Sequence, residues 1–232
     1  MLRILCLTTL LTLQMKSANA WGFWAHQRIN RIAVFLLPPE MLTLYKPSID
    51  YLTEHAVDPD KRRYASPDEA PRHYIDLDHY CTLPCDELPK RWNDAVEKYT
   101  EDTLKAYGIV PWRIQQMMYW LTDAFKEKDK GKILRLSAEL GHYIADSNVP
   151  LHTTENYNGQ LTNQYGIHGF WESRIPELFE SRYFNGYVVK STLDNYNDKM
   201  LNALFKDPIK RLQEGEKIKQ KIFDFEQDRW VY

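Results

Sequence analysis

The sequence predicts an all-α protein that folds as a single compact multi-helix domain. Its 232 residues suit one domain with a sizeable core, rather than two domains. Helical periodicity dominates the chain, and strand-like alternation is scarce. No internal repeat, low-complexity tract or linker rich in Gly and Ser separates two units. We therefore expect one domain at residues 21–232, which follows a distinct segment at residues 1–20.

The first twenty residues have the features of an export signal. Arg3 supplies the positive start, Ile4 to Leu13 form an apolar run, and Ala18-Asn19-Ala20 is a small-residue cleavage site. The run is too short to span a bilayer comfortably, and no later segment matches a membrane span in length and apolarity. We expect cleavage after Ala20 and a secreted or periplasmic protein with no transmembrane segment in the mature chain. An uncleaved anchor is the alternative that the sequence leaves open.

The charge of the chain argues against one class of function. The formal net charge is -2, and loss of Arg3 and Lys16 with the signal leaves 28 basic and 32 acidic residues, hence -4. This balance does not suggest the extended basic surface of a protein that grips duplex nucleic acid.

Two cysteines remain after the predicted cleavage, because Cys6 lies in the signal segment. In an exported protein the close pair Cys81 and Cys85 is expected to form a local disulfide. Two free thiols in a loop are the alternative.

Apolar residues at helical spacing predict the first helix, which stops at Pro38-Pro39; these residues are Ile29, Ile32, Ala33, Leu36 and Leu37. A second helix is expected from Glu40 into the fifties, with a break at Pro47. Residues 58–89 are rich in Pro, Asp and Arg and are expected to be mostly loop.

The second half of the chain is also expected to be helical. Proline at the opening turn supports the helix that starts at Pro111. Residues 147–167 are polar and rich in Asn, Thr and Gly, so they are expected to form a long loop, of a kind that is often functional. Helices are expected at residues 88–107, 111–128, 130–147, 168–180 and, as one or two more, within 193–225.

The most informative motif is His142-x3-Asp146-x5-His152 followed by His168-x3-Glu172. Residues four apart share one face of a helix, so each His/carboxylate pair can bind one ion together. His152 lies just past Pro150, which should end the helix that carries the first pair. The motif predicts a multinuclear metal site.

Two further histidines have suitable neighbours, and two do not. His26 follows Trp21 by five residues, and His73 lies in Pro71-Arg72-His73-Tyr74-Ile75-Asp76. A single histidine is more often a surface or core residue than a ligand, but two i,i+4 pairs that flank a third histidine favour metal binding. His55 and His79 lack comparable neighbours and are expected to be structural or exposed.

Zinc is the favoured metal, because imidazole and carboxylate ligands suit a borderline ion with open positions for water. Two ions roughly 3.5–4 Å apart generate a bridging hydroxide and stabilise both oxygens of a displacement. Asp146, flanked by histidines, is the candidate for a bridging carboxylate and a catalytic residue.

These residues resemble the zinc-dependent phospholipase C and S1/P1 nuclease superfamily. Its members are secreted, mainly helical enzymes that hold three zinc ions in one cleft. Their mature N-terminal tryptophan chelates one ion through its amino nitrogen and carbonyl oxygen. Here Trp21-Gly22-x3-His26 directly follows the predicted cleavage point, and the resemblance spans roughly residues 21–176.

The resemblance implies three ligand sets, one for each zinc ion. Asp146 would bridge the first two ions, and an aspartate upstream of His73 would complete the second set. Asp58 is preferred for that position, where it is also a candidate general base, and Asp60 is the alternative. The sets are Trp21, His26 and Asp146; His73, His142, Asp146 and Asp58; and His152, His168 and Glu172.

The resemblance also implies a secreted zinc-dependent phosphodiesterase that uses a metal-activated hydroxide. Glu172, the compact loop and the negative net charge favour a phospholipase C-type enzyme that acts on phospholipid headgroups. The short gap from Trp21 to His26 favours the alternative, an S1/P1-type nuclease that prefers single-stranded nucleic acid and releases 5′-nucleotides. Arg62 or Arg63 is a candidate to contact the phosphate, and a solvated arginine in a charged loop is the alternative. Tyr74 is a candidate to stack on a base or to line a headgroup pocket, and simple packing is the alternative.

The resemblance implies no stable protein partner. A non-catalytic zinc-binding protein is the rival from another class. It is disfavoured because closed structural zinc sites are typically rich in cysteine.

Overall fold

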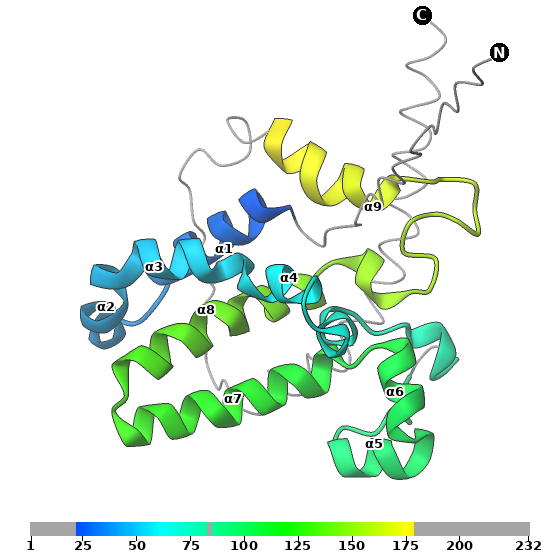
Figure 1. Ribbon diagram of the computed structural model, residues 1–232, viewed down its shortest axis with the longest axis horizontal. Coiled ribbons are helices and arrows are strands. Elements are labelled where there is room, and N and C mark those ends of the chain that lie inside the picture. The colour runs from blue at the N-terminus through cyan, green and yellow to red at the C-terminus, as the bar shows by residue number, and fades with distance from the viewer. Residues whose placement is uncertain (1–21, 83–84, 179–232) are drawn as a thin grey trace, which may run out of the picture.

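The computed structural model describes residues 22–82 and 85–178, and every regular element in these two ranges is a helix (Figure 1). This confirms the all-α class. The α-helices are α1 (Phe23–Phe35), α2 (Pro39–Tyr45), α3 (Ile49–Glu54), α4 (Asp58–Arg63), α5 (Trp92–Tyr99), α6 (Glu101–Tyr107), α7 (Val110–Glu127), α8 (Lys130–Ser147) and α9 (Ile167–Gly169).

Short helical turns connect these helices and carry several of the residues discussed below. The 3-10 turns are η1 (Lys46–Ser48), η2 (His55–Val57), η3 (Pro67–His73), η4 (Leu77–His79) and η5 (Pro150–Thr153), and α9 continues into the π-helical turn η6 (Phe170–Arg174). Across the described ranges, no helix is both long and apolar enough to cross a membrane.

The long helices α7 and α8 form an antiparallel hairpin, and α1 and α3 pack on the other side of α8 (Figure 1). The hairpin turn follows local rules, because Lys128 takes a left-handed conformation and the Asp129 side chain caps α8 by accepting the Lys132 N–H at 3.0 Å. Fully buried side chains of both helices fill the core between them, among them Ile114, Met117 and Tyr143. These two helices confirm the expected bounds closely.

Helix α1 approaches α8 closely at Gly141, where an added Cβ would collide with the side-chain oxygen of Asn30. The buried Asn30 amide donates to the Ala138 carbonyl at 3.0 Å and to the Leu52 carbonyl at 3.2 Å. One side chain therefore ties α1, α3 and α8 together. This packing brings the first residues of α1 over the C-terminal half of α8, which bears His142 and Asp146.

Two expectations of secondary structure differ from the fold. Residues 58–89 are not mostly loop but contain α4, η3 and η4, because Pro59 and Pro67 occupy opening turns, where proline supports a helix instead of breaking it. The helix expected at residues 88–107 divides at Thr100, which has a φ of 70° and caps α6. The expected break at Pro47 is confirmed by η1.

The loop between η5 and α9 is organised by amide side chains. Asn156 donates to the Thr162 hydroxyl at 3.1 Å and accepts the Leu161 N–H at 2.9 Å. The Asn158 side-chain oxygen accepts the Gly166 N–H at 3.1 Å, directly before the helix that bears His168.

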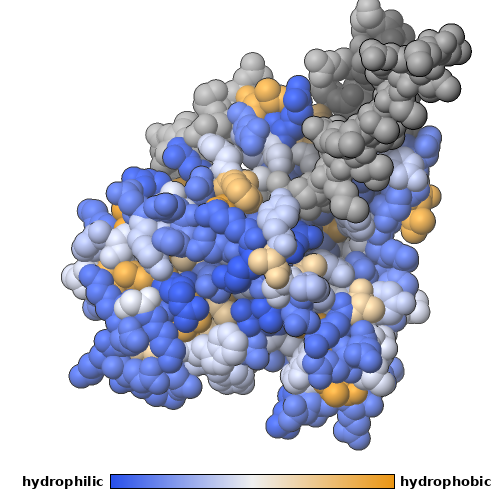
Figure 2. Space-filling view, in the orientation of Figure 1, coloured by the Kyte–Doolittle hydropathy of each residue, from blue (hydrophilic) through white to orange (hydrophobic). Residues whose placement is uncertain are grey.

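The expected disulfide between Cys81 and Cys85 is present. The face of the molecule seen in Figure 2 is mainly hydrophilic, with separate small hydrophobic patches. The export signal expected at residues 1–20, the predicted ligand Trp21 and the helices expected within 193–225 lie outside the described residues.

Candidate metal centre

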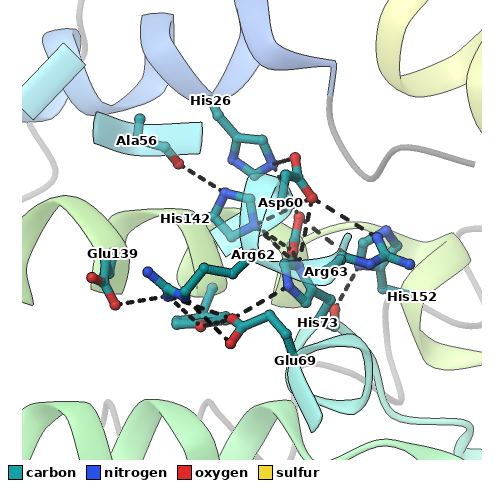
Figure 3. Close-up of polar contacts among 12 residues, drawn as sticks. His26, Ala56, Asp60, Arg62, Arg63, Glu69, His73, Glu139, His142 and His152 are labelled. Carbon is teal, nitrogen blue, oxygen red and sulfur yellow. Dashed lines mark hydrogen bonds and ion pairs between the residues drawn. The ribbon is translucent and has the colours of Figure 1, made fainter. Parts of the chain in front are cut away.

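Five side chains from four elements, α1, α4, η3 and α8, meet in the interior (Figure 3). Helix α8 contributes two of them on one face, as the i,i+4 spacing predicts. Each of the five residues is at most 2% exposed. They are His26 on α1, Asp60 on α4, His73 at the end of η3, and His142 and Asp146 on α8. We call these five residues the core group.

Asp146 occupies the centre of the core group. Its Oδ1 lies 3.3 Å from His26 Nε2, and its Oδ2 lies 2.8 Å from His73 Nδ1 and 3.2 Å from His142 Nε2. Ligand atoms of His26, His142 and Asp146 lie within 4.8 Å of one another, and so do those of Asp60, His73 and His142. The two oxygens of Asp146 therefore face different histidines, which is the arrangement of a bridging carboxylate.

A second set of ligand-type residues is carried by the loop region: His152 on η5, His168 on α9 and Glu172 on η6. We call it the loop group. His152 Nε2 lies 3.1 Å from one Glu172 oxygen, and His168 Nε2 lies 2.7 Å from the other. All three residues are buried. The two groups adjoin, since His152 Nδ1 lies 3.9 Å from Asp146 Oδ1.

The preference for Asp58 over Asp60 is corrected by the fold. Residues two apart on a helix point in different directions, and here it is Asp60 that points inward, where it is 2% exposed. Asp58 lies on the outer side of α4 and pairs with His55 Nδ1 at 2.5 Å and with Lys61 Nζ at 3.1 Å. These contacts separate Asp58 from the histidines of the core group.

Arg62, expected to contact substrate, is also turned elsewhere. Its guanidinium donates to Glu139 at 2.9 Å and reaches Glu69 at 3.4 Å (Figure 3). The neighbouring Arg63, the alternative, lines the cavity beside the ligands, together with Tyr74.

Glu69 is the residue that the sequence reading missed. It stands four residues before His73, the same spacing that singled out the pairs at 142/146 and 168/172, and its carboxylate lies 3.7 Å from His73 Nε2. That spacing was the available signal. It was obscured because residues 58–89 were expected to be loop.

Three of the imidazoles are oriented by backbone carbonyls. His142 Nδ1 donates to the Ala56 carbonyl at 2.8 Å, His152 Nδ1 to the His73 carbonyl at 2.7 Å, and His168 Nδ1 to the Tyr157 carbonyl at 3.2 Å. Each of these bonds leaves Nε2 directed at the carboxylates. Such outer contacts set the tautomer and the orientation of metal-binding histidines.

The donor atoms fit a divalent cation, and several of them are unsatisfied without one. Within the described residues, buried atoms that lack a hydrogen-bond partner include both ring nitrogens of His26, both oxygens of Asp60, Oδ1 of Asp146 and both oxygens of Glu172. A buried polar atom without a partner costs on the order of 1–3 kcal/mol. Imidazole and carboxylate donors at this density match the ligand chemistry of zinc and similar ions.

Burial and neighbouring charges shift the pKa values of the site in different directions, and those of His73 and His152 are raised by nearby carboxylates although burial opposes this. Burial lowers the pKa of His26 and of His142, so both rings are held neutral, the form that binds a metal. Burial raises the pKa of Asp60 to about 6, and the nearby charge of Asp146 adds to this rise. Burial opposes ionisation of Asp146, but the histidines around it prevail and hold its pKa well below the usual range.

A cavity of about 660 Å³ opens beside both groups. Asp60 and His73 of the core group line it, as do His152 and His168 of the loop group, and Arg63 contributes a positive charge. A molecule in this cavity would therefore reach ligands of both groups.

One family model matches the chain, that of the gliding motility associated protein GldN, over residues 172–231. No curated protein and no solved structure matches. The match covers about a quarter of the chain and begins at Glu172, so only residues 172–178 of it are described.

This match corrects the resemblance drawn from the sequence. The matching family is neither a phospholipase C family nor an S1/P1 nuclease family. The expected phosphodiesterase activity, on phospholipids or on single-stranded nucleic acid, rested on that resemblance and is withdrawn with it. The positions of the ligand-type residues do not depend on the resemblance, since they come from the fold.

Proposed function

We propose that this protein binds divalent metal ions in the core and loop groups, with zinc the favoured ion, and acts as a metal-dependent hydrolase. One observation supports this most: buried histidines and carboxylates of both groups converge on a cavity of about 660 Å³. The ligands would be His26, Asp60, His73, His142 and Asp146 in the core group, and His152, His168 and Glu172 in the loop group.

The residues of the chain have separate roles in such a reaction. A bound ion of this kind supplies a Lewis acid and lowers the pKa of coordinated water. Asp146 holds the core histidines around one point with its two oxygens. Arg63, at the cavity wall, places a positive charge where a substrate carrying negative charge would enter.

The open cavity supports catalysis as the proposal in preference to simple metal storage. A structural zinc site is typically closed by four protein ligands and holds no position open for substrate. Here four of the ligand-type residues line open space.

The secreted or periplasmic location remains a proposal that rests on residues 1–20. Similarity to a gliding motility associated protein is compatible with it.

The proposal is tested by metal analysis combined with hydrolysis assays. We expect the purified protein to contain zinc or a similar ion in multiple equivalents, and a chelator to abolish turnover that added zinc restores. A panel of p-nitrophenyl esters and peptides identifies the bond. His142→Ala should lose metal. His55→Ala is the matched control and should keep its metal, because His55 pairs with Asp58 outside both groups.

Two results would contradict the proposal in different ways. A folded, metal-free protein that does not take up divalent ions would refute the metal centre. Full metal content without turnover on any ester or peptide would refute the hydrolase and leave a metal-binding protein.

A further inference from the structure

Glu69 is a buried carboxylate behind the core group, and it is 1% exposed. Arg72 Nη1 donates to it at 2.6 Å, Arg62 Nε lies 3.4 Å away, and the hydroxyl of the fully buried Tyr143 donates to the same carboxylate. Three donors from η3, α4 and α8 therefore hold one side chain in place. Two of the donors are guanidinium groups, which compensate its negative charge.

The carboxylate held in this way faces the rear of His73. Glu69 Oε1 lies 3.7 Å from His73 Nε2, a charge contact that is longer than a hydrogen bond. The opposite nitrogen of the same ring, Nδ1, lies 2.8 Å from Asp146 Oδ2 and 3.0 Å from His142 Nε2. The His73 ring thus stands between the Glu69 charge and the remaining ligands (Figure 3).

His73 differs in this respect from three other histidines of the centre. His142, His152 and His168 each use Nδ1 on a neutral backbone carbonyl and direct Nε2 inward. His73 is reversed: it directs Nδ1 inward, and a carboxylate stands behind Nε2. A carboxylate behind a ligating histidine favours the proton on the nitrogen that faces the carboxylate. It also raises the donor strength of the other nitrogen, which faces the ion.

We infer that Glu69 is a positioning residue that keeps the proton of His73 on Nε2 and strengthens binding of the ion held by Asp60, His73 and His142. The inference rests on the proposed metal centre. It assigns a task to a carboxylate that does not line the cavity. The network of Arg62, Arg72 and Tyr143 serves to hold that carboxylate against the ring.

Glu69→Gln tests this inference, because it keeps the shape of the side chain and removes its charge. Glu139→Gln is the matched control, since Glu139 also pairs with Arg62, at 2.9 Å, but has no contact with His73. Competition with a chromogenic chelator measures zinc affinity in both variants. We expect affinity for one ion to fall about 10–100-fold in Glu69→Gln, and less than about 3-fold in the control, as for a partly exposed ion pair.

A second measurement does not require a variant to fold. In zinc-loaded wild-type protein with ¹⁵N-labelled histidine, we expect His73 to be bound through Nδ1 with a proton on Nε2. His142, His152 and His168 should be bound through Nε2 with a proton on Nδ1. Coordination of His73 through Nε2 would overturn the inference.

The failures of the two proposals are distinguishable. Wild-type protein that takes up no metal refutes the metal centre itself. Wild-type protein that binds zinc, with equal affinities in Glu69→Gln and Glu139→Gln, refutes only the role of Glu69.

Discussion

The core group and the loop group offer similar ligands to a metal, but the elements that carry them are packed differently. The core residues stand on α1, α4, η3 and α8, which pack against one another in the interior. The loop residues stand on η5, α9 and η6, where a small separate cluster of Val149, Leu151 and Ile167 supports them. A site on packed helices keeps its geometry more firmly than a site on loops. We therefore expect the ion of the loop group to be lost first.

The strongest test of this difference is Asp146→Asn. The change removes the charge that faces three histidines of the core group, His26, His73 and His142. We expect core ions to be lost, with a fall in any metal-dependent turnover of at least about 100-fold. Metal content measured by mass spectrometry checks this, and unchanged metal content would show that Asp146 is not a ligand.

The next test perturbs the packing of α1 on α8, which supports the core group and not the loop group. Gly141→Ala places a methyl group against the Asn30 side chain, where α1 crosses α8. Overpacking of this kind costs about 1–3 kcal/mol, measured here by denaturant unfolding. Since α1 carries His26, we expect weaker metal binding in the core group and little change in the loop group. Equal weakening of both would show that the two groups are not independently supported.

The converse test loosens the loop. Asn156→Ala removes the buried amide that bonds Thr162 and Leu161, at a cost of about 1 kcal/mol for each hydrogen bond lost. We expect a several-fold faster loss of one ion to a chelator, with no change for the others. The time course of chelation measures both.

The smallest expected effect is the pH dependence of the unfolding free energy that comes from Asp76. This residue lies in the cavity wall near His152. Burial, with the charge of Asp78 second, raises the pKa of Asp76 from 3.8 to about 7. A carboxyl group whose pKa is raised on folding contributes stability that is present below pH 3.8 and is lost as pH rises to 7.

Asp76→Asn should remove this part of the pH dependence. A rise from 3.8 to about 7 corresponds to about 4 kcal/mol in full, but Asp76 is only half-buried and solvent screens it. We therefore expect wild-type protein to lose on the order of 1–2 kcal/mol relative to the variant between pH 4 and 7. Unfolding free energies of both proteins across that range check the prediction, and parallel curves would contradict it.

Part of the candidate metal centre was predictable because it depends on the spacing of residues that are close in sequence. His142 and Asp146, like His168 and Glu172, are four apart, and the helix period places each pair on one face. The helices at 110–127 and 130–147 follow from apolar periodicity, a proline at an opening turn and an aspartate cap. The Cys81–Cys85 disulfide links residues that are only four apart in sequence.

Other parts were not predictable, because they depend on which way a short element turns. Asp58 and Asp60 are chemically identical neighbours, and only the packing of α4 against α8 directs Asp60 inward. The same holds for the two neighbouring arginines: Arg62 donates to Glu139, whereas Arg63 lines the cavity.

The sequence by itself determined the helical class and the residue types able to bind a metal, since periodicity and side-chain chemistry are local properties. Only the tertiary structure decided which aspartate joins the histidines, and that a buried glutamate stands behind His73. These are contacts between residues distant in the chain, and they arise from burial, which removes each side chain from water and requires it to find a partner.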